Sequence, residues 1–156
     1  MAPRLADEAT RFAVRVCGSQ ADAEDAVQEA LAALWKKHGE VEPEGAKPYL
    51  LGATWRQLMM LFRRRTTERG YTQSLPADTV APANESFDLR DALQRSMQTL
   101  QPQQRAILEL RDVQGYSYRE IGELTGLTVD QVQVYLFRAR VKMRKQLNEM
   151  GYGENQ

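Results

Sequence analysis

The chain has very little cysteine or histidine. Its 156 residues include one of each, Cys17 and His38. A lone cysteine excludes an intramolecular disulfide and a cysteine-based metal cluster, and we expect Cys17 to be a small buried apolar residue on a helix. A histidine-based catalytic or zinc site would depend on His38 alone, for which an ordinary loop residue is the better interpretation. We therefore expect no bound metal and no cofactor.

The chain also lacks long hydrophobic runs and the usual catalytic motifs. No apolar run approaches the length of a membrane span, and the N-terminus has no signal-peptide core. The protein is therefore expected in the cytoplasm. A phosphate-cradling glycine loop and a nucleophile elbow are absent. Adjacent carboxylates such as Glu24 and Asp25 do not face a common substrate on a helix. An enzyme thus has little support, and we expect no catalytic residue.

Charge is balanced in total but not in its distribution. The formal net charge is zero at pH 7, which argues against a uniformly basic nucleic-acid-binding surface. Residues 18–32 nevertheless contain four acids and no base, whereas residues 46–67 contain five bases and no acid. We therefore expect the molecule to have separate acidic and basic faces.

Apolar residues recur at spacings of three and four in nearly every segment, and β-branched runs are scarce. This pattern predicts an all-α protein. The exception is residues 68–86, where glycine and prolines stand among small polar residues, and which we interpret as a flexible linker. It separates two small helical domains. The expected helices are an opening one that ends near Gly18, followed by helices at about 21–37, 48–65, 87–100 and 102–112.

Two helix-start signals lie eleven residues apart in the C-terminal domain. Ser117 is followed three residues later by Glu120, and Thr128 is followed three residues later by Gln131. Each pair is the pattern of a capping box, in which the hydroxyl and the longer side chain satisfy each other's backbone amides. Gly126 between them can supply the positive φ of a tight turn. The segment is therefore predicted to be a helix-turn-helix, whose second helix would enter a major groove.

The second helix of this motif continues for more than four turns, to about Leu147. From Gln131 onward it contains no acid, and the side opposite its apolar face is cationic. A locally cationic helix suits a phosphate backbone. A solvated helix with bases near its C-terminus is the alternative. The cations are Arg138, Arg140, Lys142, Arg144 and Lys145.

Two parts of the chain resemble a known family. Residues 21–29, ADAEDAVQE, and the following Leu34-Trp35-Lys36 closely resemble the polymerase-binding helix of bacterial sigma factors of the extracytoplasmic-function class. The C-terminal domain is similar to the fourth conserved region of that class. The similar stretches are LQPQQR at 100–105, LRD at 110–112, GYSYREIG at 115–122 and LFRAR at 136–140.

The resemblance covers most of the chain and implies a function. It implies a region 2-like domain at 1–67, a linker at 68–86 and a region 4-like domain at 87–150. The protein would be a dissociable subunit of bacterial RNA polymerase that supplies promoter recognition, helps open the duplex and has no catalytic centre. Core polymerase and promoter DNA would be its partners. An anti-sigma factor is a possible third partner, because many members are held inactive by one.

The resemblance implies that the acidic helix docks on the polymerase clamp. Acids facing a basic partner surface add steering and register more than net affinity. The alternative, for this helix in isolation, is a solvated acidic face. The residues assigned to polymerase binding are Asp22, Glu24, Asp25, Gln28, Glu29 and Trp35.

By the same resemblance, residues 38–47 and the helix after them meet the downstream promoter element, where an unpaired base is held outside the stack. Trp55 is a candidate for stacking on that base, with a core residue as its alternative. Many relatives carry an Arg-Asn pair and a later Asp where this chain has Trp55, Arg56 and Met60, so melting residues are not transferred. The assigned phosphate-contacting cations are Lys47, Arg56, Arg63, Arg64 and Arg65.

The upstream promoter element would be read by the helix-turn-helix. Many relatives have a basic residue at the position of Gln133, and often at that of Tyr135. Gln133 can make a bidentate contact to adenine, so we predict an upstream element that is less rich in guanine. Arg138 and Arg140 are assigned to the DNA backbone. The candidates for base contact are Asp130, Gln131, Gln133, Val134 and Tyr135, with Thr128 at the start of the helix.

Two further expectations remain open. A stand-alone regulator that binds duplex DNA as a dimer is the main rival, although such a protein has no evident need for the acidic-helix sequence. Relatives also usually carry more helix before Ala2. The resemblance therefore implies that the chain begins inside the first helix or that its first domain is shorter.

Overall fold

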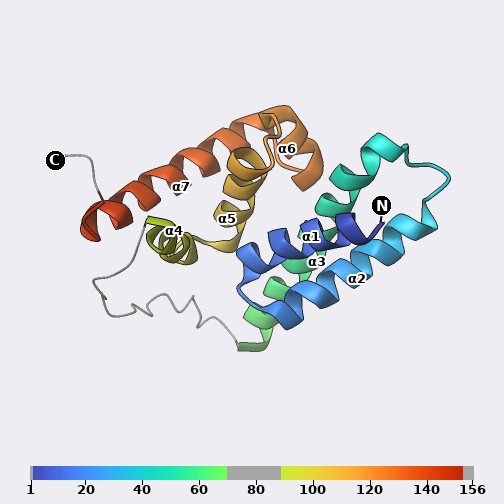
Figure 1. Cartoon of the computed structure of the whole chain (residues 1–156), viewed down its shortest axis with the longest axis horizontal. Coiled ribbons are helices and arrows are strands. Elements are labelled where there is room, and N and C mark those ends of the chain that lie inside the picture. Colours follow the sequence, from blue (N-terminus) through green and yellow to red (C-terminus); the bar gives the residue numbers. More distant parts are fainter. Residues whose placement is uncertain (1, 70–88, 153–156) are drawn as a thin grey trace.

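The computed structural model describes residues 2–69 and 89–152. Within these ranges there are helices, turns and loops but no strand, which confirms the prediction of an all-α fold (Figure 1). Residues 70–86 of the predicted linker lie outside the described residues. The α-helices are α1 (Ala2–Cys17), α2 (Gln20–Lys36), α3 (Ala46–Arg69), α4 (Leu89–Gln98), α5 (Pro102–Leu108), α6 (Tyr118–Thr125) and α7 (Val129–Glu149), with a 3₁₀ turn η1 (Pro43–Gly45) and a π turn η2 (Glu109–Val113).

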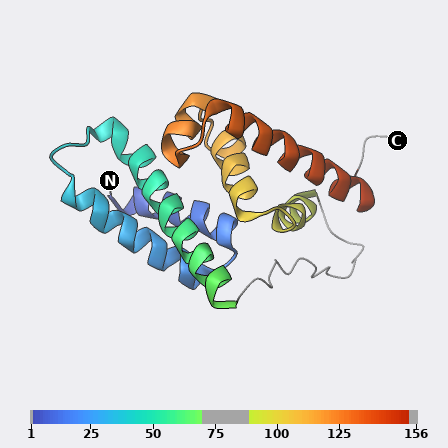
Figure 2. The same ribbon diagram turned by 180° about the vertical axis from the view of Figure 1, so that it is seen from behind.

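The N-terminal half, α1 to α3, is a bundle of three helices in which α2 and α3 run side by side (Figure 2). Ser19 caps α2, because its hydroxyl accepts the backbone N–H of Asp22 at 3.1 Å. Arg65 near the end of α3 donates two hydrogen bonds to the Asp22 carboxylate, at 2.9 and 3.0 Å. The start of α2 therefore lies against the end of α3, and residues 37–45 connect the two helices at the opposite end of the bundle.

Helix α3 is longer than predicted and buries more of its surface. It extends to Arg69 instead of about Arg65, since residues 66–68 contain neither glycine nor proline to stop it. The side chains of Leu51, Trp55 and Leu58 are all at most 3% exposed. These residues lie three and four positions apart and so share the face that packs on α1 and α2.

The C-terminal half, α4 to α7, contains the helix-turn-helix at α6 and α7. The single helix predicted for 102–112 is in fact α5 followed by the π turn η2. Two hydrogen bonds stabilise this wider turn: Arg111 Nη1 donates to the carbonyl of Tyr116 at 2.9 Å, and the Tyr116 N–H donates to the carbonyl of Leu110 at 3.0 Å. The turn directs the chain from α5 into the capped start of α6.

The two halves are packed against each other. Their buried apolar residues form one hydrophobic cluster. Arg105 of α5, 7% exposed, donates from Nε to the carbonyl of Val16 at 2.7 Å and from Nη1 to the carbonyl of Leu100 at 2.9 Å. Arg15 of α1 forms an ion pair with Glu109 at 3.3 Å. One buried guanidinium thus binds the C-terminal ends of helices from both halves.

Within the part of the chain that the structure describes, no helix is both long enough and apolar enough to cross a membrane.

Candidate nucleic-acid interface

Both predicted capping boxes are present in the helix-turn-helix. At the start of α6, the Ser117 hydroxyl accepts the Glu120 N–H at 3.0 Å, and the Glu120 carboxylate accepts the Ser117 N–H at 2.8 Å. At the start of α7, Thr128 and Gln131 make the same pair of bonds at 3.0 and 2.9 Å. Gly126 ends α6 with φ of 81°, as predicted from its position in the turn. The register of α7 is therefore fixed from its first residue.

The angle between α6 and α7 depends on the close approach of Gly122 to the turn. A Cβ at this position would lie 2.7 Å from the carbonyl oxygen of Leu127. No side chain fits at that distance, so only glycine allows the turn to pass over α6. Together with the caps, this contact presents α7 along one side of the C-terminal half (Figure 1).

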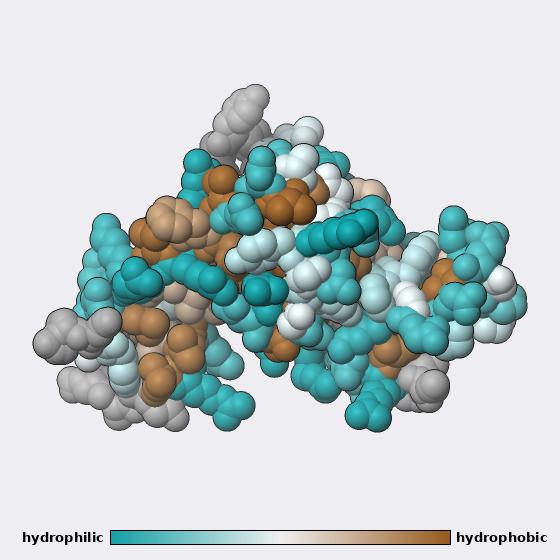
Figure 3. Space-filling model, turned by 90° about the horizontal axis from the view of Figure 1, so that it is seen from above, coloured by the Kyte–Doolittle hydropathy of each residue, from teal (hydrophilic) through white to brown (hydrophobic). Residues whose placement is uncertain are grey.

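Helix α7 has one buried and one exposed face. Val132, Leu136 and Ala139 are at most 2% exposed, and they anchor the helix on α4, α5 and α6. The predicted base-contacting residues Asp130, Gln133 and Val134 are exposed on the other side. From the side on which α7 lies, hydrophobic patches bordered by hydrophilic residues are visible over this half of the molecule (Figure 3).

The residues predicted to contact the upstream promoter element differ in how many contacts their side chains already make within the protein. The side chains of Thr128 and Gln131 are exposed but take part in the capping box. Tyr135 is half-buried and packs against the hydrophobic core. Arg140 forms an ion pair with Asp112 at 2.6 Å, which holds its guanidinium toward the protein. Arg138 is exposed, so it is the better placed of the two predicted backbone contacts.

Sequence reasoning missed Phe137, whose side chain is 68% exposed on α7. An apolar aromatic residue was not considered as a contact residue, although helical spacing could have identified it. Phe137 follows Val134 by three positions and Gln133 by four, so all three share one face. The face of α7 that was predicted to read bases is therefore partly apolar.

The predicted downstream residues lie along α3, but they do not form one uniform surface. Arg56, Arg63 and Arg64 are exposed. Lys47 forms an ion pair with Glu8 at 3.3 Å. The hydrogen bond with Asp22 raises the pKa of Arg65. Arg65, predicted to contact DNA, is therefore paired with Asp22, which is predicted to contact the polymerase.

Trp55, the candidate for stacking on an unpaired base, is 3% exposed. The structure places it in the core beside Leu51 and Leu58, so its indole has no free face for a base. The alternative named from the sequence, a core tryptophan on an apolar helix, is what the structure shows.

The acidic helix α2 presents its carboxylates to solvent. Asp25, Gln28 and Glu29 are exposed, and the exposed Glu24 accepts a hydrogen bond from Gln20 at 2.8 Å. Asp22 is half-buried and held by Arg65.

Trp35 at the other end of α2 is 71% exposed. Its ring stacks on His38 with centroids 4.9 Å apart, and the His38 ring also makes a hydrogen bond to the Trp35 carbonyl at 3.0 Å. The only histidine of the chain is thus a loop residue packed on an aromatic neighbour, as its position suggested.

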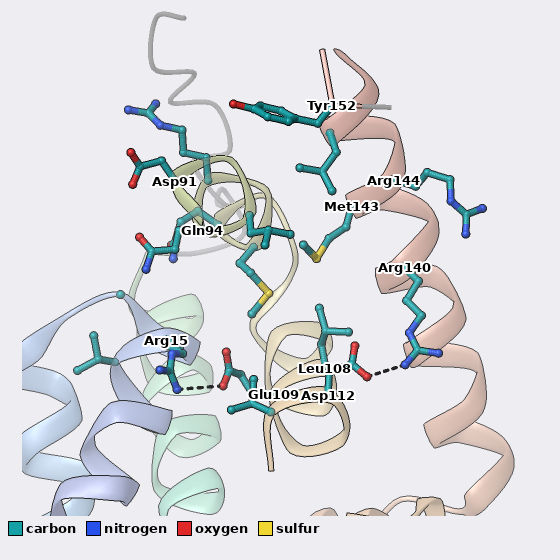
Figure 4. A pocket seen from close by; sticks show the side chains of 18 of the residues that line it. Arg15, Asp91, Gln94, Leu108, Glu109, Asp112, Arg140, Met143, Arg144 and Tyr152 are labelled. Atoms are coloured by element: carbon teal, nitrogen blue, oxygen red, sulfur yellow. Dashed lines mark hydrogen bonds and ion pairs between the residues drawn. The ribbon is translucent and has the colours of Figure 1, made fainter. Parts of the chain in front are cut away.

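A hollow of about 1190 Å³ lies between the two halves, lined by α1, α4, η2 and α7 (Figure 4). At one end of the hollow, the ion pair Arg15–Glu109 links η2 to α1 and the ion pair Arg140–Asp112 links η2 to α7, and the side chain of Met143 points into the hollow. Burial raises the pKa of Glu109, and Arg15 partly offsets this effect. The described residues contain no group of His, Cys, Asp or Glu arranged to hold a metal ion.

Comparison with known families gives two matches in chain order. The model of "Sigma-70 region 2" matches residues 2–68, and that of "Sigma-70, region 4" matches residues 90–143. Among curated relatives, the chain is 30% identical over 149 residues to the ECF RNA polymerase sigma factor SigE of Mycolicibacterium smegmatis, with 91% of the chain matched. It spans 58% of the length of that relative.

Other relatives are matched over more of their length. The RNA polymerase sigma-E factor of Streptomyces coelicolor is 28% identical, over 90% of this chain and 80% of its own. The RNA polymerase sigma factor CarQ of Myxococcus xanthus is 28% identical, over 94% of this chain and 87% of its own length. Among solved structures, the sigma factor RpoE of Bartonella quintana, crystallised with the anti-sigma factor NepR, superimposes with a TM-score of 0.72 over 92% of each chain. At 23% identity this likeness shows the fold.

Proposed function

The chain belongs to the sigma-70 family and is an RNA polymerase sigma factor of the extracytoplasmic-function class, and we propose that it reads two promoter elements, one with each half. The observation that carries the proposal is that one chain presents both an exposed acidic α2 and a capped helix-turn-helix whose α7 is exposed. A protein that only binds duplex DNA needs the second feature alone.

In this proposal residues 1–67 form the polymerase-docking domain and contact the downstream element. Residues 87–150 contact the upstream element, and residues 68–86 join the two domains. The exposed α2 residues Asp25, Gln28 and Glu29 are accessible to the polymerase clamp. Asp22 contributes less, because it is already paired with Arg65.

The downstream element is contacted through the phosphate backbone. Arg56, Arg63 and Arg64 are exposed cations on α3, and contacts of this kind set position without reading sequence. On the upstream side, Gln133 reads base edges and Arg138 binds phosphate. The protein promotes opening of the duplex as part of the polymerase and has no catalytic centre of its own.

Two further aspects belong to the same proposal. The protein acts in the bacterial cytoplasm, where core polymerase and the chromosome are found. An anti-sigma factor is a third partner. The support for it is that the solved sigma factor with this fold was crystallised with the anti-sigma factor NepR.

The proposal is tested by adding the protein to sigma-free bacterial core polymerase and measuring co-elution. We expect stable association, and we expect Asp25→Arg to reduce it at least tenfold, because the variant places a cation against a basic surface. Asp7→Arg is the matched control. Asp7 is exposed on the neighbouring helix α1, and the same charge reversal there should leave association unchanged.

The rival function predicts a different result. A stand-alone regulator would not co-elute with core polymerase, and it would bind duplex DNA by itself as a dimer. Absence of co-elution together with salt-sensitive dimeric binding would therefore overturn the proposal. Equal losses for Asp25→Arg and Asp7→Arg would overturn the assignment of docking to α2 while leaving the sigma-factor function in place.

A further inference from the structure

The exposed face of α7 carries an unusual group of apolar side chains. Phe137 is 68% exposed, Val141 is 45% exposed and Val134 is 44% exposed. Scattered apolar residues on a surface need no explanation. These three, however, follow one another at spacings of three and four and so form a continuous line along the helix. We name Val134, Phe137 and Val141 the apolar stripe.

The apolar stripe points away from the protein. The buried residues Val132, Leu136 and Ala139 occupy the opposite side of α7 and are at most 2% exposed. None of the three residues of the stripe belongs to the hydrophobic cluster on which α7 packs. A large exposed aromatic ring that the fold does not use is a candidate for contact with a partner.

The charges beside the apolar stripe indicate which partner. Arg138 and Lys145 lie along one edge of the stripe, and Gln133 and Arg144 lie along the other, as their positions on the helix dictate. Between Gln131 and Asn148 the helix contains no acid. The helix thus presents an apolar line with cations on both edges, directly after a capped turn. Such a surface fits duplex DNA, whose backbone is a polyanion and whose major groove contains apolar groups.

The major groove of DNA offers one apolar feature at the base edges, the C5-methyl group of thymine. Phenylalanine and other apolar side chains contact this methyl, whereas a glutamine amide recognises adenine. Val134 and Phe137 lie in the first three turns of α7, the part of a recognition helix that reaches base edges. Gln133 lies beside them on the same exposed face.

We infer that Phe137, supported by Val134, reads thymine methyl groups in the upstream promoter element, at a step where Gln133 faces adenine. This inference rests on the proposed function and extends it by adding a specificity-determining residue. The upstream element would then contain at least one A·T pair recognised by a methyl contact as well as by a hydrogen bond. Val141 lies a turn further along and contacts the wall of the groove.

The test uses the holoenzyme, formed from core polymerase and the full chain. Duplexes with a randomised upstream region are first selected for binding. Each thymine of the selected element is then replaced in turn by deoxyuridine, which removes the methyl group and nothing else. We expect binding to weaken about fourfold at one or two positions, the factor that corresponds to burial of one methyl-sized group.

The variant Phe137→Ala makes the test specific. It should weaken binding to the selected duplex and abolish the difference between thymine and deoxyuridine at those positions. Because Phe137 is exposed, the fold should be retained, which thermal unfolding of the variant checks. Val113→Ala is the matched control. Val113 is 56% exposed on η2 and is not part of the apolar stripe, so this variant should keep the full sensitivity to deoxyuridine.

Each other outcome overturns the inference. Insensitivity to deoxyuridine at every position, or a penalty that persists unchanged in Phe137→Ala, would show that Phe137 reads no methyl group. If Phe137→Ala instead lost association with core polymerase while keeping its duplex preference, the apolar stripe would be a protein-docking surface. Failure to select any sequence, or to form the holoenzyme at all, would count against the proposed function itself.

Discussion

Gly122 shows how a single missing side chain determines the geometry of the helix-turn-helix. The position allows the carbonyl of Leu127 to pass 2.7 Å from where a Cβ would be. We predict that Gly122→Ala lowers the free energy of unfolding by about 1 to 3 kcal/mol, because the neighbour is backbone and cannot rotate away. Chemical denaturation measures this change.

Gly39→Ala is the comparison for that measurement. Nothing lies within 4 Å of a Cβ at position 39, so its effect should stay within about 0.5 kcal/mol. If Gly122→Ala and Gly39→Ala unfolded at the same denaturant concentration, the turn would be able to relax around a methyl group, and glycine would not be required at position 122.

At the same scale, residue type alone was a poor guide to exposure. Trp55, a candidate for stacking with a core residue as its alternative, is buried, whereas Phe137, to which the sequence analysis assigns no contact, is exposed. Helical spacing gives the face of each side chain, but it does not say which face a neighbouring helix covers. That information comes from packing between segments distant in sequence.

At the scale of elements, the capping boxes account for the start of both helices of the motif. We predict that Ser117→Ala lowers the free energy of unfolding by about 1 kcal/mol, because the Glu120 N–H loses its acceptor. In a thermal unfolding experiment this corresponds to a fall in Tm of roughly 2 to 4 °C.

Ser117→Asp separates this effect from a general response to mutation. An aspartate accepts the same N–H and is an equally good N-cap residue, so it should retain most of the stability. A similar fall in Tm for both variants would show that the hydroxyl's contribution lies outside the cap.

Helix starts were easier to predict than helix ends. Capping residues are local, so Ser117 and Thr128 identified the motif directly. The sequence does not predict the π turn η2, because Ile107 and Leu110 keep helical spacing. The turn depends instead on the bonds that Arg111 and Tyr116 donate to the carbonyls of Tyr116 and Leu110. Periodicity cannot report such contacts.

At the scale of the whole molecule, burial of the Glu109 carboxyl between the two halves makes the free energy of unfolding depend on pH. Burial raises the pKa of Glu109 above its value in the unfolded chain, despite the opposing effect of Arg15. Its contribution to stability is therefore complete below the unfolded pKa, about 4.3, and is lost as pH rises through the folded pKa. Glu109→Gln does not titrate, so it should gain stability relative to the wild type as pH rises above about 4.

Urea unfolding of both proteins at a series of pH values checks this prediction. Glu149→Gln, at an exposed position near the end of α7, gives the baseline for loss of one carboxylate. If Glu109→Gln instead lost stability relative to the wild type as the pH rises, the prediction would be wrong, since Arg15 would then outweigh burial.

The helices of each half could be predicted from the sequence, but the contact between the halves could not. The composition of residues 68–86 predicts a flexible linker between two helical domains and says nothing of how those domains pack. Arg15, Arg105 and Glu109 each occupy unremarkable helical positions, and nothing local indicates that they meet. Such long-range pairing is a property of the assembled core.

Arg105 couples the stability of the N-terminal half to that of the C-terminal half, because it donates to a carbonyl in each. A guanidinium remains charged even where burial lowers its pKa, so every carbonyl that it loses leaves a buried cation less compensated. If the C-terminal end of α1 unfolds, Arg105 loses the carbonyl of Val16 as an acceptor. The C-terminal half, to which Arg105 belongs, is then destabilised as well. The halves are therefore expected to unfold cooperatively, and the stability of each is partly a property of the other's sequence.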